Sequence, residues 1–513
     1  MSSPGSKLVE FSGFLWHRIS RVVILAGIVS LVGVACSSDG GDQVGEPTSQ
    51  PGSTAVATAP GSTPDAGATP TATSTSQSPT AIAGSDPTAG PSVDATPSSP
   101  GRGATAVPAT SSPVNPEPTP VGKQARLDGI GHVVEGIREL SAGGDPNVSL
   151  VSSDRIAQEL AEDLADVEVL AEIADLEVRL KLLALMPQES NLLEVETALL
   201  EGAVVGLYNH ETGELLVLSG GDDVSVKEEA VYSHEFAHLL QDVNFDLSEL
   251  FEAAKDDSER SGALQALVEG EATFVEAIYA ARTFHSEDLG ALIAVDADVL
   301  AVLEATPNFL LLALGWPYSA GFGFTNSIWQ NGGMAAIDAV WADLPETTEQ
   351  IIHPEKYAAN EYPESSPVLP DLAAILGDGW SARTEGVLGE AVIAIWLEAL
   401  GTETAVAAQA AAGWGRDGYL LLDGPAGSSA MGLLIEWDDP GTDALQFAAA
   451  LEAVLDADAG FSRVEDGNSR VDEWNGPGGV LTFTLDGSTG AAGLAVAPTL
   501  DGATALLNAL VNR

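Results

Sequence analysis

The sequence predicts an α+β protein that is mainly helical, with a long segment unable to fold before the folded part. Residues 126–414 carry apolar side chains mostly at helical spacing, and residues 415–513 alternate between strand-like and helix-like stretches. Residues 37–125 contain almost no large apolar side chains. The folded part is therefore expected to begin near residue 126, with a separate C-terminal α+β unit from about residue 415.

Residues 1–36 have the organisation of a secretory signal. Lys7, Arg18 and Arg21 precede an apolar run over residues 22–35, which is too short for a comfortable transmembrane helix and ends at Cys36. The end of this run resembles a bacterial lipobox, although Gly33 stands where Leu is usual. We expect Cys36 to be lipidated and to anchor an extracytoplasmic protein to the cell membrane. An ordinary signal peptide, giving a secreted protein, and an uncleaved anchor are the alternatives.

Residues 37–125 consist largely of Ser, Thr, Pro, Gly, Ala and Asp. Such a segment cannot bury enough apolar surface to offset the entropy lost on folding. It is expected to be a disordered linker, partly extended by its prolines.

The charge and cysteine content exclude several classes of protein. The chain has 20 Lys and Arg against 75 Asp and Glu, a formal net charge of -55. A nucleic-acid-binding protein needs clustered cations, so nucleic acid is not an expected partner. With Cys36 as the single cysteine, the chain has no intrachain disulfide and no cysteine-based zinc site.

The folded region is predicted element by element. Helical spacing covers residues 127–141 and 156–186, and a hairpin is expected over residues 204–220 with its turn at residues 209–213. Further helices are expected over most of residues 222–285, over 291–316 and over 384–411. The last unit is read as strand, helix, two strands and a final helix.

The strongest chemical signal is the segment HEFAH at residues 234–238. Ser225 and Glu228 form a capping box that starts a helix through this segment. At 3.6 residues per turn, His234 and His238 lie on one face and can bind the same zinc ion. Glu235 lies beside them and can accept a proton from a water molecule that zinc activates.

A catalytic zinc usually has three protein ligands, so a third ligand is required. The segment EGEA at residues 269–272 resembles the third-ligand segment of gluzincin-type peptidases, which implies Glu269 as a ligand from a second helix. Other acidic residues remain alternatives. Glu271 points away from Glu269 on a helix, whereas Glu276 shares its face and is a candidate to orient a ligand histidine. Asp242, one turn beyond His238, is a second such candidate.

A wider resemblance covers the folded region. HEFAHLLQD resembles the HExxHxLQD signature of a group of bacterial metallopeptidase-type lipoproteins. Other segments of that group are similar to GLYNHETGELLVLSG, ALVEGEAT, PYSAGFGF, DLPETTEQIIHPEKY and AAAGWGRDGYLLL in this chain. The resemblance implies a gluzincin-like fold and hydrolysis of peptide bonds. It also implies that His234, His238 and Glu269 bind Zn²⁺ and that Glu235 is the general base.

The expected reaction also needs a group that stabilises the oxyanion. His353, Tyr357 and Tyr318 are candidates, although a purely structural role is open for each. The expected substrate is a peptide or a protein. The main alternative is a surface lipoprotein that binds a partner without catalysis, and intact HExxH argues against it. A structural zinc site would normally use four Cys or His ligands, and the sequence offers no such set.

Overall fold

The computed structural model describes residues 122–218, 221, 223–362, 365–458, 460–464 and 471–512, together with the backbone of Val23–Ile24. Apart from that two-residue strand, the predicted signal peptide lies outside the described residues. Cys36 and the predicted linker over 37–125 lie outside them too, and these assignments stay predictions.

The predicted α+β class with a large share of helix is confirmed. The smaller sheet has the strand order β1-β3-β4-β2, formed by β1 (Val23–Ile24), β2 (Asn147–Val151), β3 (Val204–Asn209) and β4 (Glu214–Leu218). Strands β3 and β4 pair antiparallel as the predicted hairpin, whereas β2 runs parallel to β4. The turn between β3 and β4 uses Gly213 at a φ of 64°, a conformation that glycine adopts without strain.

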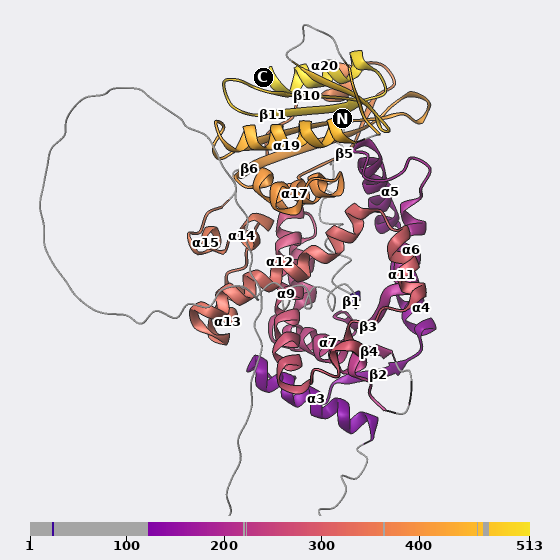
Figure 1. Cartoon of the computed structure of the whole chain (residues 1–513), viewed down its shortest axis with the longest axis vertical. Helices are drawn as coiled ribbons and strands as arrows, with labels where there is room; N and C mark the ends of the chain where they lie inside the picture. The colour runs from indigo at the N-terminus through magenta and orange to yellow at the C-terminus, as the bar shows by residue number, and fades with distance from the viewer. Residues whose placement is uncertain are drawn as a thin grey trace, which may run out of the picture. The chain divides into compact units, whose positions relative to one another are not determined.

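Helices surround this sheet and supply most of the first part of the fold (Figure 1). Helix α7 packs on β3 and β4, helix α9 packs on α7, and helix α12 packs along α9. The helices of this part are α3 (Lys123–Arg138), α4 (Ser153–Leu164), α5 (Val167–Leu182), α6 (Leu192–Ala203), α7 (Val226–Phe245), α8 (Leu247–Ala254), α9 (Ser258–Thr283), α10 (Leu289–Leu292), α11 (Ala297–Ala305), α12 (Asn308–Gly332), α13 (Met334–Ala342), α14 (Thr348–Ile352), α15 (Pro354–Ala358) and α16 (Leu372–Leu376).

The larger sheet has seven antiparallel strands in the order β5-β6-β7-β11-β10-β9-β8. Its two faces are covered by different helices, and α19 and α20 lie on opposite sides of β10 and β11 (Figure 1). The elements of this part are β5 (Ser381–Gly386), α17 (Gly389–Ala399), α18 (Thr404–Ala411), β6 (Trp414–Asp423), η2 (Pro425–Gly427), β7 (Ser429–Trp437), α19 (Asp443–Ala457), β8 (Ser462–Arg463), β9 (Asp472–Gly476), β10 (Gly479–Leu485), β11 (Ala492–Ala497) and α20 (Leu500–Val511).

Both faces of the larger sheet are buried, which explains its nearly continuous apolar strands. In β7, Leu433 and Ile435 pack in the cluster that contains Phe447 of α19, while Leu434 packs in the cluster that contains Leu506 of α20. Alternate residues of a strand point to opposite faces, so a sheet covered on both sides needs apolar residues at every position.

Several sequence predictions differ from the observed elements. The helix expected over residues 291–316 is divided among α10, α11 and α12, and the C-terminal unit contains β6, β8 and β9 besides the expected strands. The helix expected over residues 384–411 begins as strand β5 and is then divided into α17 and α18 by Gly401 at a φ of 113°. The segment over residues 156–186 likewise forms two helices, because Asp166 caps the start of α5 with its side chain.

Among the described residues, no single helix combines the length and apolar character needed to span a membrane. The only candidate there is a pair of helices, Ala297–Ala305 and Asn308–Gly332, bent by 113° and selected by length and composition alone.

Candidate metal centre

The helix that carries HEFAH begins where the sequence predicts. The Ser225 side chain accepts from the backbone N–H of Glu228, and the Glu228 side chain accepts from the backbone N–H of Ser225, which completes the predicted capping box. The helix is buried from Glu229 to Gln241, between the smaller sheet and α9. His234, Glu235 and His238 are therefore held at 1%, 1% and 3% exposure in the centre of this part of the fold.

Three ligand atoms from two helices converge in this centre. The distance is 3.0 Å from His234 Nε2 to His238 Nε2, 3.2 Å from His234 Nε2 to Glu269 Oε2, and 3.4 Å from His238 Nε2 to Glu269 Oε2. Glu269 comes from α9 and is 1% exposed. The three residues thus form a His-His-Glu cluster able to hold a metal ion.

The spacing of these atoms matches what a small tetrahedral ion requires. Metal–nitrogen and metal–oxygen bonds of about 2.0–2.1 Å place neighbouring ligand atoms of a tetrahedron about 3.3 Å apart. The three observed distances of 3.0, 3.2 and 3.4 Å lie around this value. The donor set and its spacing therefore fit a divalent zinc ion, whose catalytic sites use three protein ligands and leave the fourth position to water.

The second nitrogen of each histidine has an acceptor as its partner. His234 Nδ1 lies 3.2 Å from Glu276 Oε2, and a carboxylate can only accept there. His238 Nδ1 lies 2.9 Å from Gln241 Oε1. Both Nδ1 atoms therefore carry hydrogen, so two neutral rings direct two Nε2 lone pairs at each other and at Glu269. Such an arrangement needs a shared cation, either a proton or a metal ion.

The ionisation of the cluster reflects this need for positive charge. Burial opposes a charged ring, but the hydrogen bonds to Glu269 and Glu276 outweigh it and raise the pKa of His234 to about 10. Burial also acts to raise the pKa of Glu269, yet the two histidines outweigh burial and hold that pKa below its usual value. A negative carboxylate facing two imidazoles attracts a cation to this point.

Glu235 lies beside the ligands without being one of them. Burial raises the pKa of its carboxyl to about 7, against the lowering effect of His238 and His234. Its Oε1 is buried and has no hydrogen-bond partner among the described residues. A β-carbon at Gly206 of strand β3 would lie only 3.1 Å from this Oε1, so the glycine leaves room for the carboxylate. A buried carboxylate oxygen with no partner is suited to accept a hydrogen from a water molecule.

Of the three candidate oxyanion donors, the structure brings only Tyr318 to the cluster. Its ring stacks on the His234 ring at 6.0 Å, and the side chain hydrogen-bonds Glu269. Burial, followed by the nearby Glu269 and Glu235, raises the pKa of Tyr318 well above its usual value. The phenol therefore stays protonated and can donate.

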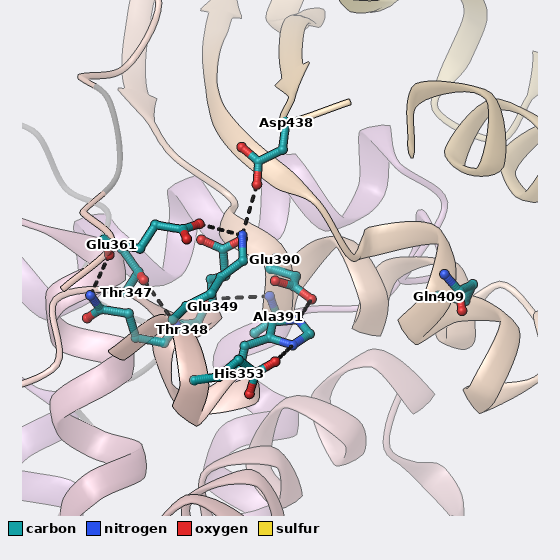
Figure 2. Close-up of polar contacts among 12 residues, drawn as sticks. Thr347, Thr348, Glu349, His353, Glu361, Glu390, Ala391, Gln409 and Asp438 are labelled. Carbon is teal, nitrogen blue, oxygen red and sulfur yellow. Dashed lines mark hydrogen bonds and ion pairs between the residues drawn. The ribbon is translucent and has the colours of Figure 1, made fainter. Parts of the chain in front are cut away.

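The other two candidates have partners elsewhere. The Tyr357 hydroxyl donates to the backbone carbonyl of Asp343 at 2.7 Å. His353 Nε2 donates to Glu390 Oε1 at 2.9 Å, in the group of polar contacts drawn in Figure 2. The structure directs both side chains to these partners and not to the cluster, so it gives their predicted part in stabilising an oxyanion no support.

The contacts in Figure 2 include a second group of acids, formed by Glu349, Glu361 and Asp438. Lys356 Nζ lies 2.7, 2.7 and 2.9 Å from their carboxylates. The lysine ammonium already supplies the positive charge that these three acids need. We therefore read this group as an ion-pair network.

Asp242 does not orient a ligand histidine, which corrects the sequence prediction. Its Oδ2 accepts from the Tyr208 hydroxyl at 2.8 Å and its Oδ1 accepts from the Leu247 backbone N–H at 3.0 Å. The neighbouring Gln241 contacts His238 instead. Helical spacing places both Gln241 and Asp242 within reach of His238. The hairpin residue Tyr208 engages Asp242, and Gln241 is the residue that contacts His238.

Helix α9 approaches α12 very closely beside the cluster. A β-carbon at Gly270 would lie 2.0 Å from the carbonyl carbon of Gly321, and one at Gly321 would lie 1.8 Å from the carbonyl oxygen of Ala266. Gly270 therefore serves the contact between α9 and α12, the helix that carries Tyr318.

Two buried glutamines at the cluster were not predicted as site residues. Gln241 and Gln265 are both 0% exposed, and Gln265 Nε2 donates to Glu269 Oε1 at 2.9 Å. Gln241 lies three residues after His238, and Gln265 lies four residues before Glu269. Both separations place the two residues on one helix face, and this spacing could have identified the glutamines from the sequence.

Comparisons with known proteins reach only the C-terminal part of the chain. Residues 378–506 match a domain of unknown function, DUF8575, which spans the larger sheet from β5 to most of α20. No curated protein and no solved structure matches the chain. The matched residues contain none of the candidate ligands His234, His238 and Glu269.

Proposed function

We propose that this protein is a zinc-dependent peptidase of gluzincin type, related to the HExxHxLQD group that its sequence resembles. The observation that carries the proposal is the convergence of His234 Nε2, His238 Nε2 and Glu269 Oε2 at mutual distances of 3.0–3.4 Å. Those distances suit zinc, and Glu235 lies beside the ligands with a free carboxylate oxygen.

The residues of this chain have distinct roles in the proposed reaction. When bound, zinc would lower the pKa of a water molecule and polarise the substrate carbonyl. Glu235 accepts the proton of the attacking water and passes it to the leaving amine, for which a pKa near 7 is well matched. The Tyr318 hydroxyl would exchange its hydrogen bond to Glu269 for one to the developing oxyanion. Glu276 holds the His234 ring in the orientation that presents Nε2.

The substrate is proposed to be a peptide or protein outside the cytoplasm. This location rests on the sequence of residues 1–36, where Cys36 would carry the lipid anchor to the cell membrane. A lipid-anchored domain on a long linker would act on substrates close to the membrane surface.

The test uses the purified full chain and its Glu235→Gln variant, with Glu252→Gln as a control at a carboxylate that is 70% exposed. Wild type and both variants should contain stoichiometric zinc. Wild type and the control should cleave members of a broad peptide library, and a chelator should abolish that cleavage. Glu235→Gln should lose about 10²–10⁴-fold in rate, the usual contribution of a general base.

Two results would contradict the proposal. Wild-type-like cleavage by Glu235→Gln would exclude the assigned mechanism. Stoichiometric zinc without cleavage of any library peptide would favour the alternative, a surface lipoprotein that binds a partner without catalysis.

A further inference from the structure

Each of the three ligand side chains has a polar atom that a buried side chain on α7 or α9 holds, and Glu269 also hydrogen-bonds Tyr318 of α12. Glu276 holds His234, Gln241 holds His238, and Gln265 holds Glu269. The two glutamines are completely buried. Burying a neutral amide is unfavourable unless its hydrogen bonds are made, so these two positions need an explanation.

Gln265 controls how Glu269 presents its carboxylate. The Gln265 amide N–H donates to Oε1 at 2.9 Å, while Oε2 of the same carboxylate faces the two histidines. The reverse orientation of this amide would set two acceptor oxygens against each other, so the hydrogen bond fixes the orientation. The Gln265 Oε1 atom is buried and has no hydrogen-bond partner among the described residues. The residue therefore tolerates an unsatisfied oxygen in order to keep its donor on Glu269.

Gln241 connects a ligand histidine to the helix of the third ligand. Its Oε1 accepts from His238 Nδ1 at 2.9 Å, and its Nε2 donates to the Val268 carbonyl at 2.9 Å. Val268 directly precedes Glu269 on α9. One amide thus sets the hydrogen position on the His238 ring and the register between α7 and α9.

We propose that Gln265 and Gln241 are positioning residues of the metal centre with separate tasks. Gln265 occupies Oε1 so that Glu269 offers a single oxygen to a metal ion, which keeps one coordination position open. Gln241 keeps His238 Nε2 free of hydrogen and aimed at the ion. This inference rests on the proposed function, because it concerns how the chain's residues would hold zinc.

The two tasks predict different defects. Gln265→Met removes the donor at similar volume and frees Oε1 to approach the ion alongside Oε2, so coordination number should rise while affinity is kept. Gln241→Met leaves the His238 ring without a partner, and loss of such a partner typically lowers metal affinity about 10–100-fold. Gln241→Glu retains an acceptor for His238 but sets a carboxylate oxygen against the Val268 carbonyl, so it should recover only the part of the affinity that the hydrogen bond to His238 supplies.

The experiment loads the full chain with Co²⁺, whose visible absorption distinguishes four-coordinate from five-coordinate sites, and measures affinity by competition with a chromophoric chelator. Gln350→Met is the matched control, because Gln350 is a glutamine 2% exposed whose amide donates to the Glu361 carbonyl in another part of the fold. The control should match wild type in both spectrum and affinity. Gln265→Leu provides a second variant if the methionine variant does not fold.

Each outcome decides the inference. A wild-type spectrum in the Gln265 variants, or wild-type affinity in Gln241→Met, overturns the corresponding assignment while leaving the metal centre intact. A wild-type chain that binds no Co²⁺ overturns the proposed function, and this inference falls with it. A higher coordination number in the Gln265 variants together with a loss of affinity in Gln241→Met supports it.

Discussion

The contact between α9 and α12 allows a sharp prediction about stability. In Gly270→Ala, the new β-carbon would meet the Gly321 carbonyl carbon at 2.0 Å and its α-carbon at 2.3 Å. Ordinary contact between carbon atoms requires about 3.5 Å, so the helices would have to separate by about 1.5 Å. No side chain can move away to relieve this clash, because both opposing atoms belong to backbone.

The expected change in the free energy of unfolding of Gly270→Ala follows from two opposing effects. Overpacking a core costs about 1–3 kcal/mol, and a clash with backbone lies at the upper end or above. Replacing a helical glycine with alanine returns up to about 1 kcal/mol of helix propensity. We expect Gly270→Ala to lose about 3 kcal/mol of unfolding free energy. It should also weaken metal binding, because Glu269 is the adjacent residue.

Equilibrium unfolding in guanidinium chloride measures this loss, with metal affinity determined alongside. Gly323→Ala is the control, since Gly323 lies on α12 two residues after Gly321, is exposed, and its β-carbon would meet nothing within 4 Å. The control should be neutral or gain up to about 1 kcal/mol. The double variant Gly270→Ala/Gly321→Ala should lose less than the sum of its single variants, because both report one separation of the helices. A loss below about 0.5 kcal/mol in Gly270→Ala, or an equal loss in the control, would refute the reasoning.

Two further predictions concern charges away from the metal centre. Burial raises the pKa of Glu349 to about 7, against the effect of Lys356, so this carboxyl is easier to protonate in the folded chain than in the unfolded one. The stability that its protonation contributes is therefore complete below about pH 4.5 and is lost as pH rises through 7, by up to about 3 kcal/mol. Between pH 5 and pH 7, the unfolding free energy should fall less in Glu349→Gln than in wild type. An equal fall in both proteins would exclude Glu349 as the cause. In Glu271→Gln, the 1%-exposed Arg138 keeps only the half-exposed Asp338 as a counter-ion. Thermal or denaturant unfolding should reveal a loss of about 3 kcal/mol, as is typical when a buried ion pair is broken from one side, and a change under 1 kcal/mol would show that Asp338 suffices.

The local elements that carry the His-His-Glu cluster could be predicted because their signals lie within a few residues. The capping box at Ser225 and the turn at Gly213 act through the adjacent backbone, and the structure shows both. The spacing of His234 and His238 follows from helix geometry alone. The prediction that Glu271 faces away from Glu269 rests on the same geometry, and Glu271 indeed binds Arg138 and Trp341.

The identity of the supporting residues required tertiary structure. His353, Tyr357 and Tyr318 were equal candidates in the sequence, and packing of α12 along α9 brings only Tyr318 to the cluster. Likewise, Tyr208 of the hairpin engages Asp242, which leaves His238 to Gln241. Such choices depend on residues distant in sequence, and helical spacing alone cannot make them.

The sequence by itself determined the helix that carries HEFAH, the position of its two histidines on one face, the adjacent Glu235 and, through a resemblance, Glu269 as the third member of the cluster. It also determined the α+β class, because the period of apolar residues differs between helix and strand. Only the tertiary structure decided that Glu269 meets the histidines through one oxygen while Gln265 holds the other. The physical reason is that the cluster depends on the angle and separation between α7 and α9, and these are set by tertiary contacts such as that of Gln241 with the Val268 carbonyl rather than by local propensity.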